Sequence, residues 1–245
     1  MSSTNVAEIY VIGNSSCHYN NLKTNIRQEF DPEKDSEVLD YIEFIMNTSI
    51  RNKTFPILLI SAHGNVINGE YILKIIGKNE LVLKASIISD KLKECKARGL
   101  RCIGLIEACH SGNFDVSGFE MAITASSSEN VASYGIIQQS LDELLKNTFF
   151  TCHEIYKLLT DKDSYVNKVR SAWSSYVEPS CQLTGKDTNL QLIHPSSFKE
   201  IRNLKLRGTT LEFTNQLNKN KKTIGDYDVN QVYSMMCALY GKPVE

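Results

Sequence analysis

The sequence predicts a three-layer α/β fold in which helices flank both faces of a mostly parallel central sheet. Apolar runs of the kind that a strand buried on both faces needs recur along the chain, and helical patterns separate them. Strands joined through helices pair in parallel, because each helix returns the chain to the same end of the sheet. The strands that we expect span residues 8–13, 55–62, 101–107 and 119–125.

The elements between these strands are predicted from capping residues and from periodicity. A first-turn proline, acidic residues at a helix start and a glycine at a helix end each mark a boundary. Two short alternating runs around a Gly-Lys-Asn turn predict a hairpin. The elements are a helix from Asp31–Glu33 to about Ser49, a hairpin over 70–85, a helix over 86–99 that Gly99 ends, and helices near 136–146 and 151–161.

The chain is expected to divide into a main domain over residues 1–195 and a helical extension over 196–245 that packs on it. Residues 226–241 place Val229, Val232 and Met236 on one face of a helix. Packing of this face into a core is favoured over binding of a partner.

Composition excludes several classes of function. The formal net charge is −1, with 27 basic and 28 acidic residues, so no overall field attracts nucleic acid or an anionic membrane. No apolar run reaches the length of a membrane span and no secretory signal begins the chain, so we expect a cytoplasmic protein. The seven cysteines are odd in number and irregularly spaced, which favours reduced thiols over a disulfide framework.

Two strand ends carry the residues of a candidate catalytic site. His63 and Gly64 follow one apolar strand, and Cys109 follows another, 46 positions later (109 minus 63). The carboxyl ends of parallel strands meet at one edge of a sheet, which is where such folds bind their ligands. An imidazole there can activate a thiol for nucleophilic attack. The N–H groups of Gly64 and Cys109 can then stabilise the oxygen of a tetrahedral intermediate.

Other uses of cysteine and histidine compete with this interpretation. A single free cysteine is usually a small buried core residue, and a single histidine often bonds locally. Metal binding is disfavoured because each Cys-His pair is adjacent in sequence and no Cys-x-x-Cys motif is present. No glycine-rich loop fits a phosphate, so we expect no cofactor and no metal. A calcium requirement cannot be inferred from the sequence.

Four segments resemble the caspase, metacaspase and legumain cysteine peptidases over roughly residues 8–185. "ISAHGN" is similar to their histidine strand, and "IEACHSGNF" resembles both the Glu-Ala-Cys of legumains and the Cys-His-Ser-Gly of metacaspases. "MAITASSSENVASYG" is similar to the Thr-Ala strand and serine-rich loop of legumains, and "TFFTCHEIYKLL" to a later helix of the caspase-like domain. Caspases have Gln-Ala before the cysteine, whereas this chain has Glu107 and Ala108.

The resemblance implies a role for each residue of the site. His63 would be the general base and then the acid, Cys109 the nucleophile, and Gly64 with Cys109 the donors to the oxyanion. His110 is expected to be a turn residue and not a second base.

The resemblance also implies the residues that bind substrate. Glu107 would line the pocket for the residue before the cut, Ser133 of the serine-rich loop would contact substrate, and Arg27 or His18 would balance the charge of Glu107. The alternative is that Glu107 is a buried carboxylate paired with a local arginine, lysine or backbone N–H.

We therefore expect a cysteine endopeptidase that cuts a protein or peptide substrate through a thioester intermediate, after Arg or Lys and less readily after Asn. A catalytically silent domain of the same fold is the main alternative. A transamidase or ligase with the same acyl-enzyme is another. A regulatory protein partner is compatible with each of the three.

Overall fold

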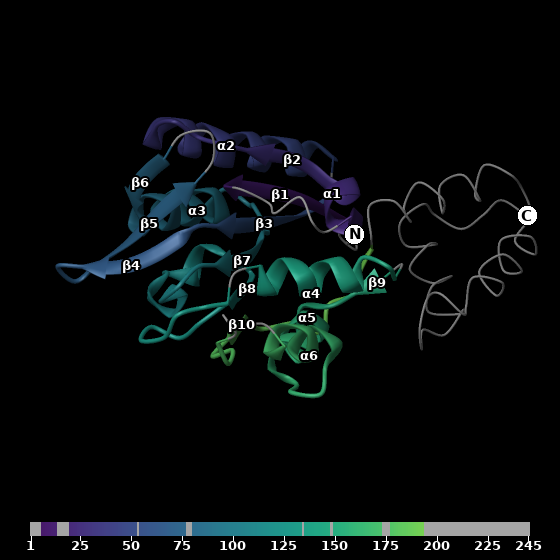
Figure 1. Ribbon diagram of the computed structural model, residues 1–245. Helices are drawn as coiled ribbons and strands as arrows, with labels where there is room; N and C mark the ends of the chain where they lie inside the picture. Colours follow the sequence, from purple (N-terminus) through teal and green to yellow (C-terminus); the bar gives the residue numbers. More distant parts are fainter. Residues whose placement is uncertain are drawn as a thin grey trace, which may run out of the picture.

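A computed structural model describes residues 6–13, 20–52, 54–76, 80–133, 135–147, 149–172 and 177–193. A six-stranded sheet in the order β10-β8-β7-β3-β1-β2 forms its centre (Figure 1). All neighbouring strands in it are parallel except β10, which runs antiparallel to β8. Its strands are β1 (Ala7–Gly13), β2 (Ile26–Phe30), β3 (Phe55–Ser61), β7 (Ile103–Glu107), β8 (Met121–Thr124) and β10 (Gln182–Gly185).

Two smaller sheets accompany the central one. The antiparallel strands β4 (His63–Ile67), β5 (Glu70–Ile76) and β6 (Glu80–Lys84) form an arm that extends from the carboxyl end of β3. β9 (Phe149–Phe150) pairs with β11 (Leu192–Ile193). The helices are α1 (Asn20–Asn25), α2 (Asp35–Asn52), α3 (Ala85–Ala97), α4 (Ile136–Leu144), α5 (Cys152–Thr160) and α6 (Tyr165–Ser171).

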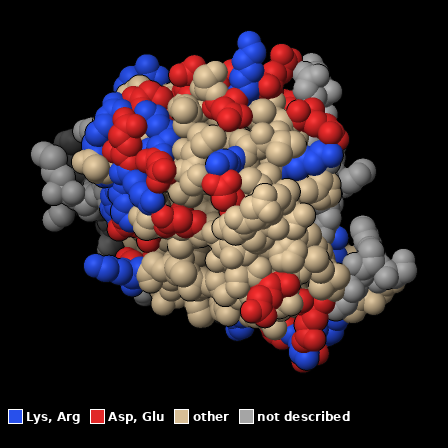
Figure 2. Space-filling model, turned by 90° about the vertical axis from the view of Figure 1, so that its left-hand side faces the viewer, with Lys and Arg blue, Asp and Glu red and all other residues tan. Residues whose placement is uncertain are grey.

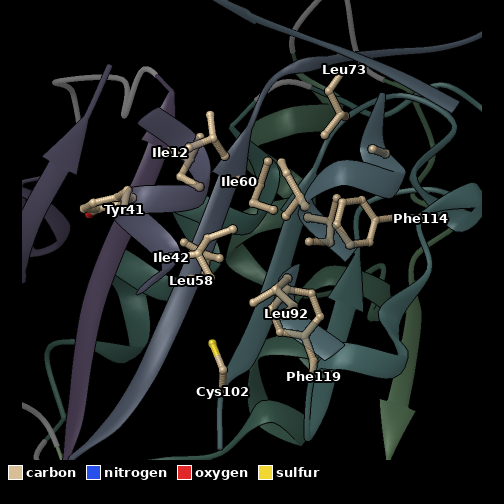
Figure 3. Close-up of a cluster of buried hydrophobic side chains, with 14 of the residues drawn as sticks. Ile12, Tyr41, Ile42, Leu58, Ile60, Leu73, Leu92, Cys102, Phe114 and Phe119 are labelled. Carbon is tan, nitrogen blue, oxygen red and sulfur yellow. The ribbon is translucent and has the colours of Figure 1, made fainter. Parts of the chain in front are cut away.

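Side chains that alternate along the central strands fill two separate cores. On β1, Tyr10 and Ile12 face α2, α3 and the three-stranded arm, whereas Ile9 and Val11 face α1, α4 and α5. Figure 3 shows the first core, in which Phe114 and Phe119 from the segment after β7 pack near Leu92 of α3. Strands that are apolar on both faces, covered by helices on both, give the three layers that the sequence predicts.

The four predicted central strands, the hairpin over 70–85 and the helices near 86–99, 136–146 and 151–161 are confirmed. The predicted start of α2 at residues 31–33 is wrong, because the helix begins at Asp35. Residues 26–30 before it form β2, a strand at the edge of the sheet whose three central residues are exposed. Its polar sequence therefore gave no strand signal.

Opposite charges are intermixed on the face of the molecule that Figure 2 shows. Glu43 of α2 forms ion pairs with Lys91 of α3 and with Arg98, the residue after α3, at N–O distances of 2.9 and 2.8 Å. These two cations hold the pKa of Glu43 down at about 2. The two helices are therefore joined by a surface ion-pair network, which contributes more than isolated exposed pairs do.

Within the described residues, no helix has the length and apolarity needed to cross a membrane. The helix predicted over 226–241 lies outside the described residues, and so does the whole extension over 196–245. The division of the chain at residue 195 therefore stays a prediction.

Candidate active site

The carboxyl ends of β3 and β7 lie side by side and deliver the two candidate catalytic segments to one place. The strands are parallel neighbours with Ser61 opposite Glu107. Just beyond that level, the Ala62 N–H donates to the Glu107 carbonyl at 3.2 Å. His63 and Cys109 each follow two residues after these paired positions, so both leave the same edge of the sheet.

The backbone at Gly64 lies against the backbone at Cys109. A β-carbon at position 64 would overlap both the carbonyl oxygen of Cys109 and the hydroxyl of Tyr71. Only glycine permits this close approach. The Tyr71 hydroxyl, on β5, donates to the same Cys109 carbonyl at 2.8 Å. Burial and the neighbouring Cys109 raise the pKa of Tyr71, so the phenol stays a donor.

His63 begins β4. This strand was not predicted, because "HGNVI" has no run of buried side chains. Its side chain is exposed, and its backbone pairs with Lys74 of β5. The arm thus carries both His63 and Tyr71 to Cys109. The histidine is held at the start of a paired strand and not in an irregular loop.

The chain turns sharply after Cys109. His110 has the left-handed φ of 56°, which non-glycine residues seldom adopt. Its N–H donates to the Asn130 carbonyl at 2.8 Å, and its ring nitrogen Nδ1 lies 3.3 Å from the Ser128 carbonyl. His110 is therefore a turn residue, as expected, that joins this turn to the loop after β8.

Cys109 differs in exposure from the other cysteines that the structure describes. It is partly exposed, whereas Cys95, Cys102, Cys152 and Cys181 are buried. Burial raises the pKa of Cys152 and of Cys181 to about 12, which keeps these thiols protonated. The Ala132 N–H approaches the Cys109 sulfur at 3.5 Å.

The described part of the chain contains no group of three His, Cys, Asp or Glu side chains that could hold a metal ion.

Glu107 is buried, with a relative exposure of 2%, directly before this turn. One carboxylate oxygen accepts from the Ile137 N–H at 3.2 Å and the other from Gln138 Nε2 at 2.8 Å. Both donors lie in the first turn of α4, where the helix dipole favours a negative charge. Burial nevertheless raises the pKa of Glu107 to about 7, against the hydrogen bonds and the charge of Arg170.

These contacts of Glu107 agree with the alternative of a buried, paired carboxylate. The role of Glu107 in the substrate pocket stays a prediction.

Ser133 already has hydrogen-bond partners within the chain. Its hydroxyl donates to the Val177 carbonyl at 2.9 Å and accepts from the Val177 N–H at 3.0 Å. A contact between Ser133 and substrate likewise stays a prediction.

The prediction that Arg27 balances Glu107 is wrong. Arg27 is the second residue of β2 and pairs with Glu8 at 2.7 Å, near the amino end of β1. Because β2 runs parallel to β1, its first residues lie at the end of the sheet opposite to Glu107. His18, the other candidate, lies outside the described residues.

Comparison with solved structures identifies the architecture. The chain superimposes on the crystal structure of the Drosophila initiator caspase Dronc with a TM-score of 0.51 and 10% sequence identity, covering 79% of this chain and 85% of that one. This chain has a caspase-like fold. Caspase-1 from Spodoptera frugiperda is also similar, with a TM-score of 0.47, 13% identity and coverage of 79% and 92%. No protein-family model and no curated protein matches the sequence.

Three residues of this caspase-like fold that bear on the site were missed from the sequence. Tyr71 lies on the buried side of β5 with Leu73 and Ile75, so its alternation was a usable signal. Gln138 and Arg170 are buried polar residues of α4 and α6. No local pattern indicates that these two helices meet near Glu107.

Proposed function

We propose that the chain is a cysteine endopeptidase in which Cys109 is the nucleophile and His63 the general base. One observation carries the proposal: the partly exposed thiol of Cys109 follows β7 at the carboxyl end of a caspase-like sheet, and the backbone of Gly64, the residue after His63, packs against the backbone carbonyl of Cys109. The remaining described cysteines are buried and have no such neighbour. A reactive cysteine needs both access and a nearby base.

The proposed reaction proceeds in two halves. His63 accepts the thiol proton as the Cys109 sulfur attacks the carbonyl carbon of the scissile peptide bond. The tetrahedral intermediate collapses, the carbon–nitrogen bond breaks, and His63 donates its proton to the leaving amine. His63 then takes a proton from water, which attacks the thioester. The second tetrahedral intermediate collapses, the carbon–sulfur bond breaks, and the acid product leaves while His63 returns its proton to the cysteine sulfur.

The tetrahedral oxygen would be stabilised by the backbone N–H groups of Gly64 and Cys109. Tyr71 supports this assignment indirectly, because its hydroxyl holds the Cys109 carbonyl, which belongs to the peptide unit that follows the Cys109 N–H. The close approach that Gly64 permits brings the two backbones to one site. Removal of one such donor typically costs about 10²- to 10³-fold in kcat.

The preferred residue before the cut is the finer part of the proposal. An ionised Glu107 would favour a cationic side chain, so we rank Arg and Lys first, Asn second and Asp last. A positional peptide library tests this ranking. A preference for Asp, or an unchanged profile in Glu107→Gln, would remove Glu107 from specificity and leave it a structural carboxylate.

Labelling with an electrophilic peptide probe tests the proposed chemistry. We expect the wild-type chain to be labelled at Cys109 and to cleave library peptides, and Cys109→Ala and His63→Ala to do neither while keeping the far-ultraviolet circular dichroism spectrum. His153→Ala, which alters another exposed histidine, is the matched control and keeps activity. A wild-type chain that folds but shows neither labelling nor turnover would instead be a silent scaffold. Products that incorporate an added amine would indicate a transamidase or ligase.

A further inference from the structure

Two fully buried serines join the turn after Cys109 to the loop after β8. Ser111 and Ser126 each have a relative exposure of 0%. The Ser126 N–H donates to Ser111 Oγ at 3.0 Å, and the Ser111 N–H donates to Ser126 Oγ at 3.1 Å. The two hydroxyl oxygens lie 3.2 Å apart. We call this reciprocal pair the serine clasp.

The serine clasp holds the backbone on both sides of the candidate nucleophile. Ser126 Oγ donates to the carbonyl of Ala108, the residue before Cys109, at 3.2 Å. The Ser111 N–H that it receives lies two residues after Cys109. A single hydroxyl therefore fixes the chain before and after Cys109, and the nucleophile lies between the two attachment points.

Both hydroxyls of the serine clasp already have hydrogen-bond partners within the chain. Ser126 Oγ gives its proton to Ala108 and accepts from the Ser111 N–H. Ser111 Oγ accepts from the Ser126 N–H and lies 3.3 Å from the Ser126 carbonyl, to which it can donate. Neither hydroxyl keeps a free proton for the substrate. Both are buried, so loss of one leaves its partners unsatisfied in a site closed to solvent.

We propose that the serine clasp is a positioning device for the reaction, which holds the Cys109 peptide in the orientation that aims its N–H at the developing oxyanion. This inference rests on the proposed function. Ser111 and Ser126 act through Cys109 and touch no reacting atom. The same geometry explains why the turn tolerates the left-handed His110, since the backbone on either side is fixed.

The close packing of the two segments supports the proposal. A β-carbon at Gly112 would overlap the backbone of Ser127 and Ser128, so the turn and the loop touch through their main chains. On the exposed side, Asn113 Nδ2 donates to the carbonyls of His110 and Ser128 at 3.0 and 2.8 Å. The buried clasp is thus one part of a continuous attachment, and it is the part that reaches Ala108.

The test compares Ser126→Ala with Ser89→Ala. Ser89 is equally buried on α3, and its hydroxyl bonds only within that helix, to the Ala85 carbonyl. For each variant, kcat and KM are measured on a cleavable peptide. The rate of Cys109 alkylation by iodoacetamide is measured by mass mapping of the peptide that carries it. Thermal unfolding reports stability. Alkylation requires an accessible Cys109 thiolate but no donor to an oxyanion, whereas peptide hydrolysis also requires the oriented N–H groups.

We expect Ser126→Ala to lower kcat about 10- to 100-fold with KM and alkylation of Cys109 unchanged, because a small displacement of a catalytic group has a cost of this size. Ser89→Ala should lower the unfolding temperature without changing kcat. If Ser126→Ala does not fold, Ser111→Ala carries the same test with a smaller expected loss, since it leaves the bond from Ser126 to Ala108.

An unchanged kcat in a folded Ser126→Ala or Ser111→Ala variant would overturn the clasp as a positioning device, and so would an equal fall in kcat and in alkylation. In both cases an active wild-type chain leaves the proposed function intact. A wild-type chain that neither cleaves peptides nor reacts with the peptide probe overturns both proposals, so the two failures are distinguishable.

Discussion

The two ends of β7, in the central sheet, each have a flanking cysteine and a buried glutamate nearby, in contrasting surroundings. At the amino end, Glu8 of β1 accepts from Arg27 at 2.7 Å and from the hydroxyls of Tyr10 and Thr54 at 2.9 and 2.8 Å. Cys102, which precedes β7, has a relative exposure of 1%. At the carboxyl end, Glu107 accepts from a backbone N–H and a side-chain amide, and Cys109 is partly exposed.

For the two cysteines that flank β7, the surroundings at each end of the strand, and not the residue type, decide whether the thiol is accessible. At the amino end, Arg27 and the hydroxyls of Tyr10 and Thr54 donate to Glu8, and the Cys102 thiol is buried. At the carboxyl end, the chain leaves the sheet in turns and an arm. The Cys109 thiol there is accessible, and Glu107 accepts hydrogen bonds from the first turn of α4. This is where open parallel sheets place their chemistry.

The two cysteines that bracket β7 give the largest expected contrast. Cys109→Ala should lower turnover by roughly a thousandfold or more, because the nucleophile is lost, with little change in stability. Cys102→Ala should keep turnover and lower the free energy of unfolding by about 1 to 2 kcal/mol, because it leaves a small cavity in a packed core. Peptide hydrolysis and chemical denaturation measure the two effects. Turnover near the wild-type rate in Cys109→Ala would refute the assignment of the nucleophile.

The two glutamates should respond oppositely to the same substitution. Below pH 4.5, Glu107 is protonated in both the folded and the unfolded chain. As the pH rises from 4.5 to about 7, the unfolded chain releases this proton while the folded chain retains it, so stability falls. The full difference, about 3 kcal/mol, persists above pH 7. Glu107→Gln removes this pH-dependent loss, so its stability relative to the wild type should rise as the pH increases from 5 to 8. The amide offers one acceptor oxygen to the two donors, which adds a cost that does not change with pH.

Glu8→Gln is the matched control. It weakens the bond to Arg27, whose side chain is 43% exposed, so it should cost at most about 1 kcal/mol at pH 8. Urea denaturation of both variants and the wild type at pH 5 and pH 8 measures the differences. A stability difference between Glu107→Gln and the wild type that does not change with pH would contradict the raised pKa of Glu107.

The central strands could be predicted because burial on both faces requires an unbroken apolar run. β2 and β4 could not, because an edge strand and an exposed arm place polar side chains on the surface. Cys109 and His63 were identifiable because each directly follows a strand. The surroundings of Glu107 were not, since Gln138 and Arg170 approach it through tertiary packing of α4 and α6. Arg27 was misassigned because the missed strand β2 runs parallel to β1 and begins at the opposite end of the sheet.

The smallest expected effect concerns the segment between β7 and β8, which we predict stays uncut in the active protein. Residues 110–135 contain one aspartate, Asp115, and no lysine or arginine. Asp115 is itself engaged: Lys93 of α3 contacts it at 2.7 Å and the Ser117 N–H donates to it at 3.0 Å. Lys93 first, and then Ser117, lower the pKa of Asp115 to about 2. The flanking Phe114 and Phe119 are buried, so a protease would have to detach the segment from the core before it could bind an extended stretch there.

Asp115→Ala tests this last prediction. Because the pair with Lys93 is on the surface, its loss should cost less than about 1 kcal/mol. The cost should be present above pH 4 and should vanish as the pH falls toward 2, where Asp115 becomes protonated in the folded chain. Turnover should not change, and wild-type and variant protein should each migrate as a single intact chain when active. Two fragments with a junction inside residues 110–135 in the active wild type, absent in an inactive Asp115→Ala variant, would show that cutting there is required. In that case the candidate site at the carboxyl end of the sheet would form only after cleavage. The contrast between the two ends of the sheet would then not be a property of the uncut chain.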